Sequence, residues 1–259
     1  MNGTSAYKVL ELLYEYYKDS KDELASVDAP EVLEVGSHEW LVYMFYSCLL
    51  DYGTRSQIYH NNLIKTYEKY PEIFDAKYVL DNFRGNHEEL LKIMKDNIHP
   101  RYPNVATDKW IKLSCELVKY EDLKKHISKM NLEEFEAYVK GIGGFGQKTG
   151  GLLIRLIVDS KIINCEQDLN FIPIDRHDIE ISYLNGIASK SNLNEQEIRE
   201  LSDLFIKCGH NLRIDASTVD KYLWNVGNTF CNKADCFNCP LRKNCKTKME
   251  VVNNESNND

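Results

Sequence analysis

The feature that most constrains this chain is a run of glycines around a single lysine, "GIGGFGQKTGG", residues 141–151. Six of the chain's 13 glycines lie in it. Glycine allows positive φ and leaves backbone N–H groups uncovered. Residues 132–140 before the run, and Lys148 to Val158 within and after it, have apolar residues at helical spacing. The pattern predicts two helices joined by a glycine hairpin whose amides, with the positive end of the second helix, bind an anion.

A nucleotide-binding loop is the competing interpretation, and the spacing argues against it. Such a loop has the form G-x-x-x-x-G-K-[ST] and follows a strand. Gly141 and Gly146 are correctly spaced, but Gln147 comes before Lys148, and the preceding segment is helical in pattern. The hairpin therefore favours a nucleic-acid backbone, whose phosphates it would bind without reading bases.

The sequence also predicts helices in the rest of the chain, so the predicted fold class is all-α. Ser37 and Gly53 begin and end one predicted helix, while Asn131 caps the first helix of the hairpin. Asn194 begins another helix that we expect to end at Gly209. No pair of alternating apolar runs is joined by a hairpin turn, so nothing predicts a sheet.

Charge and hydropathy constrain the partners only loosely. The net charge of −8 comes from residues 1–35, with a balance of −5, and residues 250–259, with a balance of −3. The body is therefore neutral and can carry a basic face for nucleic acid. No apolar run approaches the roughly 20 residues that span a bilayer. We expect a soluble protein without membrane contact and a disordered tail at 249–259.

The hairpin resembles the helix-hairpin-helix signature of the endonuclease III superfamily of DNA glycosylases, L-P-G-V-G-x-K-T-A. "GFG" matches G-V-G and Lys148-Thr149 matches K-T, while Ile142-Gly143 replaces L-P and Gly150 replaces the alanine. The resemblance implies a bilobal all-α glycosylase fold with a small four-cysteine loop. It also implies that Lys148 is the catalytic nucleophile. The implied DNA-backbone contacts are Gly144, Gly146, Gln147 and Thr149.

The chemistry implied for Lys148 requires a neutral amine, although lysine ordinarily has a pKa of about 10.4. Burial and the positive end of a helix both favour the neutral form. The first turn after a glycine hairpin is expected to offer both. The amine then forms a Schiff base at C1′ of a nucleotide flipped out of the duplex.

A carboxylate is needed to stabilise the positive charge that develops on the sugar. Asp175-Arg176-His177 resembles the family's V-D-T-H segment, in which the aspartate is catalytic. Asp178 is the alternative. Pro173 fixes the entry to the segment and favours Asp175. The link from Lys148 to Asp175 is longer than in endonuclease III, and with "IPID" it resembles the archaeal 8-oxoguanine glycosylases.

Four of the eight cysteines, Cys231, Cys236, Cys239 and Cys245, form the pattern C-x4-C-x2-C-x5-C. Four thiolates this close in sequence can hold Zn²⁺ or a [4Fe–4S] cluster. The superfamily pattern for [4Fe–4S] is C-x6-C-x2-C-x5-C, so the last three cysteines match and the first gap is two residues short. The resemblance favours an iron–sulfur cluster that orders a basic loop, with zinc as the alternative.

The resemblance extends over roughly residues 37–248. It implies a helical barrel domain at 37–160 and a cluster domain formed by 1–36 and 161–248. Tyr52 takes the place of the family's gap-filling glutamine, either as a wedge between bases or as packing.

The implied function is base-excision repair by a DNA glycosylase and AP lyase acting on double-stranded DNA that contains a damaged base. We expect a monomer in a prokaryotic cytoplasm, at the nucleoid. A monofunctional glycosylase and a non-catalytic DNA-binding module remain alternatives. The motifs do not identify the base; an oxidised purine is the first expectation and an oxidised pyrimidine the second.

Overall fold

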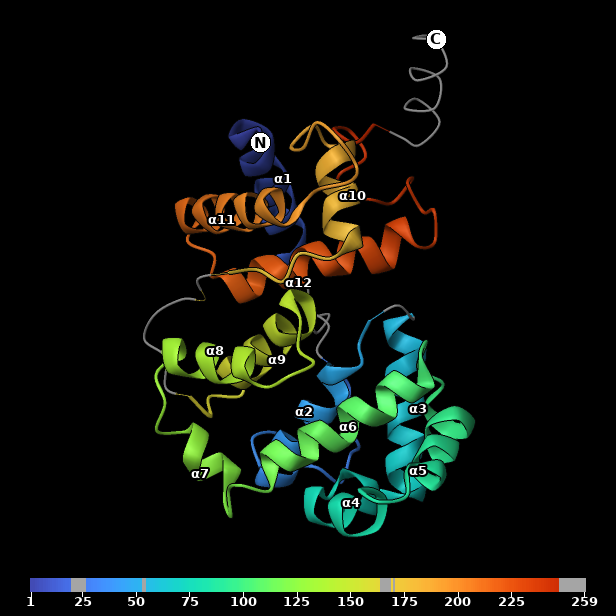
Figure 1. The fold of residues 1–259 in the computed structure, drawn as a ribbon. Coiled ribbons are helices and arrows are strands. Elements are labelled where there is room, and N and C mark those ends of the chain that lie inside the picture. Colours follow the sequence, from blue (N-terminus) through green and yellow to red (C-terminus); the bar gives the residue numbers. More distant parts are fainter. Residues whose placement is uncertain (20–26, 53–54, 164–168, 170, 247–259) are drawn as a thin grey trace. The chain divides into compact units, whose positions relative to one another are not determined.

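A computed structural model describes residues 1–259 except 20–26, 53–54, 164–168, 170 and 247–259. Every regular element within the described residues is a helix, so the all-α prediction is confirmed (Figure 1). The predicted disordered tail, 249–259, lies outside the described residues. No helix in the described part of the chain has the length and apolarity that crossing a membrane requires.

The chain divides into two compact units. The hairpin unit is Val27–Glu166, and the cysteine unit combines Met1–Ser26 with Gln167–Asp259. The hairpin unit contains α2 (His38–Leu49), α3 (Ser56–Lys69), η1 (Pro71–Phe74), α4 (Ala76–Phe83), α5 (His87–Ile93), η2 (Met94–Ile98), α6 (Pro103–Leu117), α7 (Leu123–Ile127), α8 (Leu132–Gly141) and α9 (Gln147–Asp159).

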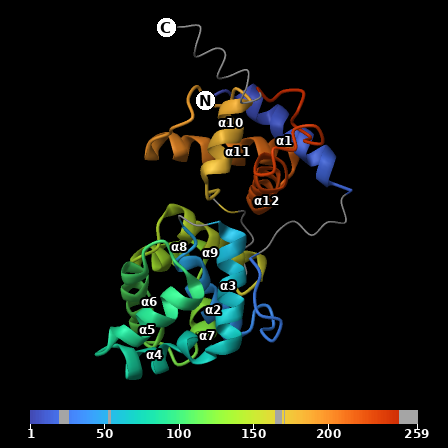
Figure 2. The ribbon, with the colours of Figure 1, turned by 90° about the vertical axis from the view of Figure 1, so that its right-hand side faces the viewer.

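Helix α2 is the core of the hairpin unit. Nine of the ten positions from Trp40 to Leu49 are buried, and α2 contacts α6, α7 and α9. Ser37 caps it as predicted, because its Oγ accepts a hydrogen bond from the N–H of Trp40 at 3.0 Å. The adjoining helix α6 packs on α4 and α5 (Figure 2). An apolar helix buried on this many sides fixes the position of the segment that follows it.

The end of α2 differs from the prediction. The helix ends at Leu49, whereas the predicted stop, Gly53, lies outside the described residues. A tight turn ends the helix, since the N–H of Asp51 donates to the carbonyl of Cys48 at 3.2 Å and the N–H of Tyr52 donates to that of Leu50 at 2.7 Å. This earlier end places Asp51 in a turn instead of in the last helical turn.

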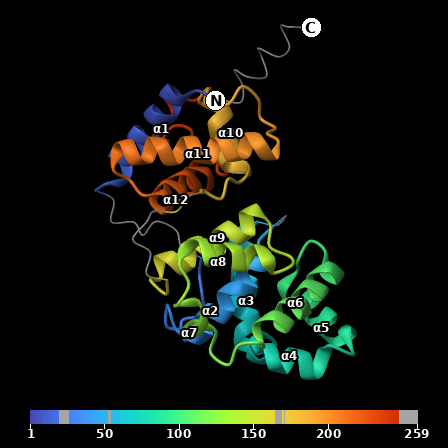
Figure 3. The ribbon, with the colours of Figure 1, turned by 60° about the vertical axis from the view of Figure 1, so that its left-hand side comes forward.

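The cysteine unit contains α1 (Gly3–Tyr17), α10 (Arg176–Leu184), α11 (Glu195–Leu212), α12 (Ala216–Val226) and η3 (Gly227–Cys231). Figure 3 shows α1 beside α11, with which it is in contact. Asn194 caps α11 as predicted, but the helix runs past Gly209 to Leu212. Gly209 instead permits close packing, because a Cβ there would lie 2.8 Å from Cγ2 of Val219 on α12.

Candidate active site

The glycine hairpin joins α8 to α9 as the sequence predicts. Asn131 and Glu134 form a reciprocal capping box at the start of α8. In the hairpin, Gly144 has a φ of +116°, and a Cβ there would lie 3.1 Å from Cδ1 of Leu49. The turn therefore requires glycine at Gly144 for both its backbone conformation and its space.

Helix α9 starts directly after the hairpin. Gly146 is its N-cap residue, and the N–H of Gly146 donates to Oγ1 of Thr149 at 2.9 Å. The side chain of Thr149 is buried, so it holds the first turn of α9 in place. Gly146 and Gln147 are exposed. The first amides of a helix lack intrahelical partners and attract anions.

Tyr52 and Lys109 lie beside the hairpin. Nζ of Lys109, on α6, donates to the carbonyl oxygen of Gly144 at 3.1 Å and is 4.4 Å from the centre of the Tyr52 ring. Tyr52 is half-buried. The structure thus brings a cation and an aromatic ring to the hairpin. Sequence reasoning missed Lys109, which is one of two lysines on α6 and has no motif around it.

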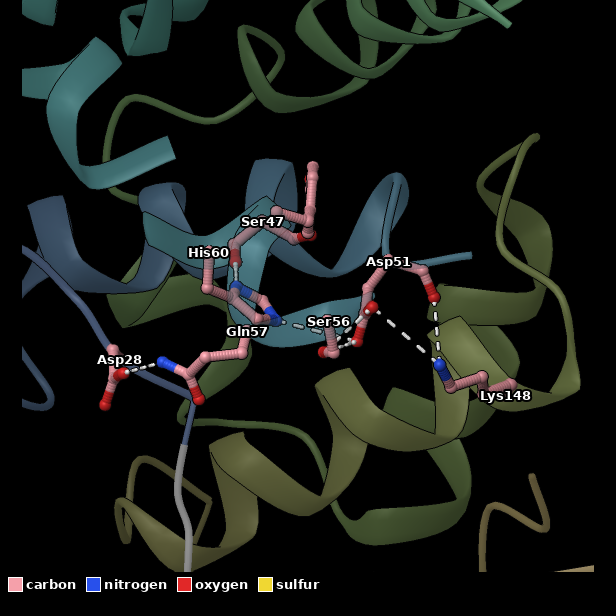
Figure 4. A network of polar contacts seen from close by, with 8 residues as sticks. Asp28, Ser47, Asp51, Ser56, Gln57, His60 and Lys148 are labelled. Carbon is pink, nitrogen blue, oxygen red and sulfur yellow. Dashed lines mark hydrogen bonds and ion pairs between the residues drawn. The ribbon is translucent and has the colours of Figure 1, made fainter. Parts of the chain in front are cut away.

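Lys148 occupies the first turn of α9, and its amine meets Asp51. Nζ of Lys148 donates to the backbone oxygen of Asp51 at 3.2 Å and is 3.7 Å from Oδ1 of the same residue (Figure 4). The Lys148 side chain is 37% exposed, and that of Asp51 only 3%. The surroundings differ from the expected burial, because the lysine side chain is partly exposed and an acid that follows α2 reaches its amine.

Asp51 is held by groups on α3. Oγ of Ser56 is 3.0 Å from Oδ1 and 3.1 Å from Oδ2 of Asp51, and Nε2 of His60 is 3.6 Å from Oδ2. Burial raises the pKa of Asp51, but His60, the charge of Lys148 and Ser56 outweigh it, and the net pKa lies below its usual range. Asp51 is therefore a carboxylate at neutral pH.

Ser47, His60 and Asp51 form a chain in which Oγ of Ser47 is 3.1 Å from Nδ1 of His60. The same three residue types form the catalytic triad of serine hydrolases. Ser47 is fully buried within α2, so no substrate can reach its hydroxyl. The chain accordingly orients Asp51 toward Lys148.

The importance of Asp51 could have been suspected from one signal in the sequence. It directly follows the apolar run that forms α2, and an acid near a helix C-terminus faces the negative end of the helix dipole. A buried acid at that place requires a cationic partner. The pattern cannot say which of the 32 lysines and arginines supplies it.

In the cysteine unit, Asp175 caps α10 and Asp178 lies beneath it. Oδ1 of Asp175 accepts hydrogen bonds from the N–H groups of His177 at 2.6 Å and Asp178 at 3.2 Å. Asp175 is half-buried, whereas Asp178 is only 2% exposed. Asp175 is thus the more accessible of the two candidate carboxylates. The predicted catalytic pair, Lys148 and Asp175, comes from the two different units.

The four clustered cysteines occupy the end of η3 and the loop after it. Cys231 is the last residue of η3. Burial, together with neighbouring acidic groups that include the other three cysteines, raises the pKa of the Cys231 thiol to about 12. Within the described residues, no three metal-binding side chains stand close enough to hold an ion. Four cysteine thiolates at this sequence spacing suit an iron–sulfur cluster or zinc. In the described structure, however, no three of them lie close enough together to bind one ion.

Two solved structures share this fold. The 8-oxoguanine DNA glycosylase of Thermotoga maritima matches with a TM-score of 0.58 at 15% identity, over 87% of this chain and 97% of that one. The Methanocaldococcus jannaschii 8-oxoguanine glycosylase/lyase, in complex with DNA containing 8-oxoguanine, matches with a TM-score of 0.53 at 15% identity, over 74% and 83% of the two chains.

No family model matches the sequence, and none of the curated proteins is similar enough to it to count as a match. The fold is that of the helix-hairpin-helix DNA glycosylases, as the motifs predicted. The likeness to 8-oxoguanine glycosylases that the "IPID" segment suggested is also confirmed, at the level of the fold.

Proposed function

We propose that this protein is a DNA glycosylase with AP-lyase activity that removes a damaged base from double-stranded DNA. The observation that carries the proposal is the place of Lys148, in the first turn of α9 directly after the glycine hairpin. Its amine is partly exposed and can reach a substrate. The hairpin amides, with Lys109 nearby, supply positive charge for the DNA backbone beside that amine.

The proposed reaction begins when the neutral amine of Lys148 attacks C1′ of a flipped-out nucleotide. A nitrogen–carbon bond forms while the bond from C1′ to the base breaks, and the base leaves with that electron pair and takes up a proton. The sugar ring then opens to a Schiff base. Loss of the C2′ proton expels the 3′ phosphate, which cuts the strand, and water releases Lys148.

Asp175 is the carboxylate that we propose for charge stabilisation in this reaction. Its side chain is half-buried at the N-terminus of α10, and a preorganised carboxylate stabilises positive charge on the sugar as the base departs. Asp178 is the weaker candidate, because it is buried below Asp175. Its oxygen Oδ2 is also occupied by the N–H of Asp175 at 2.7 Å.

For the substrate we propose an oxidised purine. The long link between Lys148 and Asp175 supports this choice, as do two neighbours of the same fold that are described as 8-oxoguanine glycosylases. At 15% identity the pocket residues are free to differ, so an oxidised pyrimidine is the second candidate.

The four cysteines are proposed to hold a [4Fe–4S] cluster. The residues that would ligate it are Cys231, Cys236, Cys239 and Cys245, and the soft thiolate donors suit iron–sulfur or zinc. When bound, the cluster would order the loop. The lysines and the arginine of that loop would then bind phosphate groups of the DNA.

The test is incubation of the purified protein with duplexes that carry 8-oxoguanine, thymine glycol, uracil or an abasic site. Base release together with strand cutting supports the proposal, and the duplex that is processed fastest identifies the base. Base release from an uncut strand would instead indicate a monofunctional glycosylase in which Asp175 activates water. Salt-dependent binding without either product would indicate a DNA-binding module.

A further inference from the structure

We propose that Asp51 is a positioning residue for the Lys148 amine, which it holds at one place for attack on the sugar. This inference rests on the proposed function, because it assigns a role in the same reaction. The acid comes from the turn after α2 and is distinct from Asp175 and Asp178, the carboxylates of the other unit.

The geometry allows Asp51 to hold the amine at one place. Two contacts fix Nζ of Lys148, at 3.2 Å from the backbone oxygen and 3.7 Å from Oδ1 of Asp51. A lysine side chain has several rotatable bonds, so fixing its end lowers the entropy lost on reaching the reactive position. The anchor itself is rigid, since Ser56 donates to both carboxylate oxygens.

The Asp51 side chain is also linked to the buried core of the hairpin unit. Helix α2 lies beneath it, and the hydroxyl of Tyr59 on α3 donates to the carbonyl of Ser47 at 2.8 Å. His60 bridges the same serine to Asp51. A buried carboxylate that served only the fold would require no exposed partner. Here one of its partners is Lys148, whose side chain is 37% exposed, and a buried acid paired with an accessible base is typical of a functional site.

Other titratable or charged groups that the structure describes near the pair come from α2, α3, α9 and the turn after α2. They are Cys48, Tyr52, Tyr59, His60 and Arg155. Burial raises the pKa values of Cys48 and Tyr59, so neither of them brings a second negative charge to the pair at neutral pH.

The role predicts a defined effect on the reaction. Asp51 places the amine, so its loss should lower the rate of adduct formation at saturating duplex and leave duplex binding unchanged. A purely structural residue would change the amount of folded protein and leave the rate per folded molecule unaltered. The rate per folded molecule consequently separates the two roles.

The test is single-turnover borohydride trapping on a saturating abasic-site duplex, together with the Kd for that duplex, for the wild type and for Asp51→Asn. The asparagine is of similar size and removes only the charge. We expect the trapping rate per folded molecule to fall by about tenfold while the Kd for the duplex stays unchanged.

Glu136→Gln is the matched control, because Glu136 is also a buried acid of the hairpin unit and lies 3.7 Å from Nζ of Lys140. Its trapping rate should equal that of the wild type. Asp51→Glu restores the carboxylate and should return the trapping rate toward the wild-type value. If Asp51→Asn does not fold, as judged by circular dichroism, Asp51→Ser replaces it.

The outcomes distinguish this inference from the proposed function. An Asp51→Asn trapping rate equal to that of the wild type overturns the inference while leaving the lyase proposal in place. A wild type that gives no adduct overturns the proposed function, and with it the inference. A rate that falls equally in Glu136→Gln also counts against Asp51, because the effect would then be one of net charge.

Discussion

Asp175 and Asp178 cap the first turn of α10 reciprocally, each side chain accepting a hydrogen bond from the other residue's N–H, at 2.7 Å and 3.2 Å. Asp178 lies underneath, almost without solvent contact. Burial, followed by the charges of Asp175 and Asp220, raises the pKa of Asp178 well above its usual range. The folded cysteine unit therefore keeps a proton that the unfolded chain loses.

This difference makes a prediction about stability and pH. An acid whose pKa is higher in the folded state stabilises the fold most at low pH, and that contribution disappears as the pH rises above the unfolded value of 3.8. Asp178→Asn cannot titrate. The free energy of unfolding of the wild type, relative to Asp178→Asn, should therefore fall as the pH rises from about 4 toward neutrality.

Urea unfolding of both proteins across this range measures the effect. Asp203→Asn is the control, since Asp203 is an exposed acid on α11 of the same unit. Its stability curve should run parallel to that of the wild type. If the curve of Asp178→Asn also runs parallel, Asp178 does not carry the buried proton.

The glycines of the hairpin should differ sharply in their tolerance of alanine. Gly144 has a φ of +116° and a Leu49 carbon 3.1 Å from the position of a Cβ, whereas nothing lies within 4 Å of a Cβ at Gly143. Gly144→Ala should lower the free energy of unfolding by about 1–3 kcal/mol. Gly143→Ala should change it by less than about 0.5 kcal/mol. Denaturant titration checks both, and equal losses would contradict the described turn.

The parts of the fold that the sequence predicts are those fixed by neighbouring residues. The capping boxes at Asn131 and Asn194 and the start of α9 depend on side chains within three positions of each other. Local patterns of this kind are visible in the sequence. The ends of helices are harder to predict from the sequence. Gly209 was the predicted end of α11, but it packs against Val219 of α12, and this tertiary contact decides its role.

The same distinction explains what the sequence missed in the candidate site. Lys148 is found through its motif, but its partner Asp51 is 97 residues away in the chain. Their meeting depends on how α9 packs against α2, which no local pattern specifies. Lys109 reaches the hairpin through a similar long-range contact, 35 residues away from Gly144. The motif pointed to Lys148, and tertiary packing determined its surroundings.

The cysteine loop makes a prediction about metal content. Protein purified without oxygen should contain iron and acid-labile sulfide in the ratio of a [4Fe–4S] cluster. Cys239→Ser should lose both, because it removes one of four ligands, while Cys115→Ser should retain them, since Cys115 lies outside the cluster on α6. Zinc without sulfide would contradict the iron–sulfur proposal and leave the zinc alternative.

The most direct test of the central proposal is borohydride trapping of the wild type and of Lys148→Gln on duplexes with 8-oxoguanine or an abasic site. Glutamine keeps the length of the side chain nearly unchanged and cannot form a Schiff base, so the fold should persist. We predict a covalent protein–DNA adduct for the wild type and none for Lys148→Gln, which should still bind the duplex. An adduct of undiminished yield in Lys148→Gln would remove Lys148 from the mechanism and contradict the account.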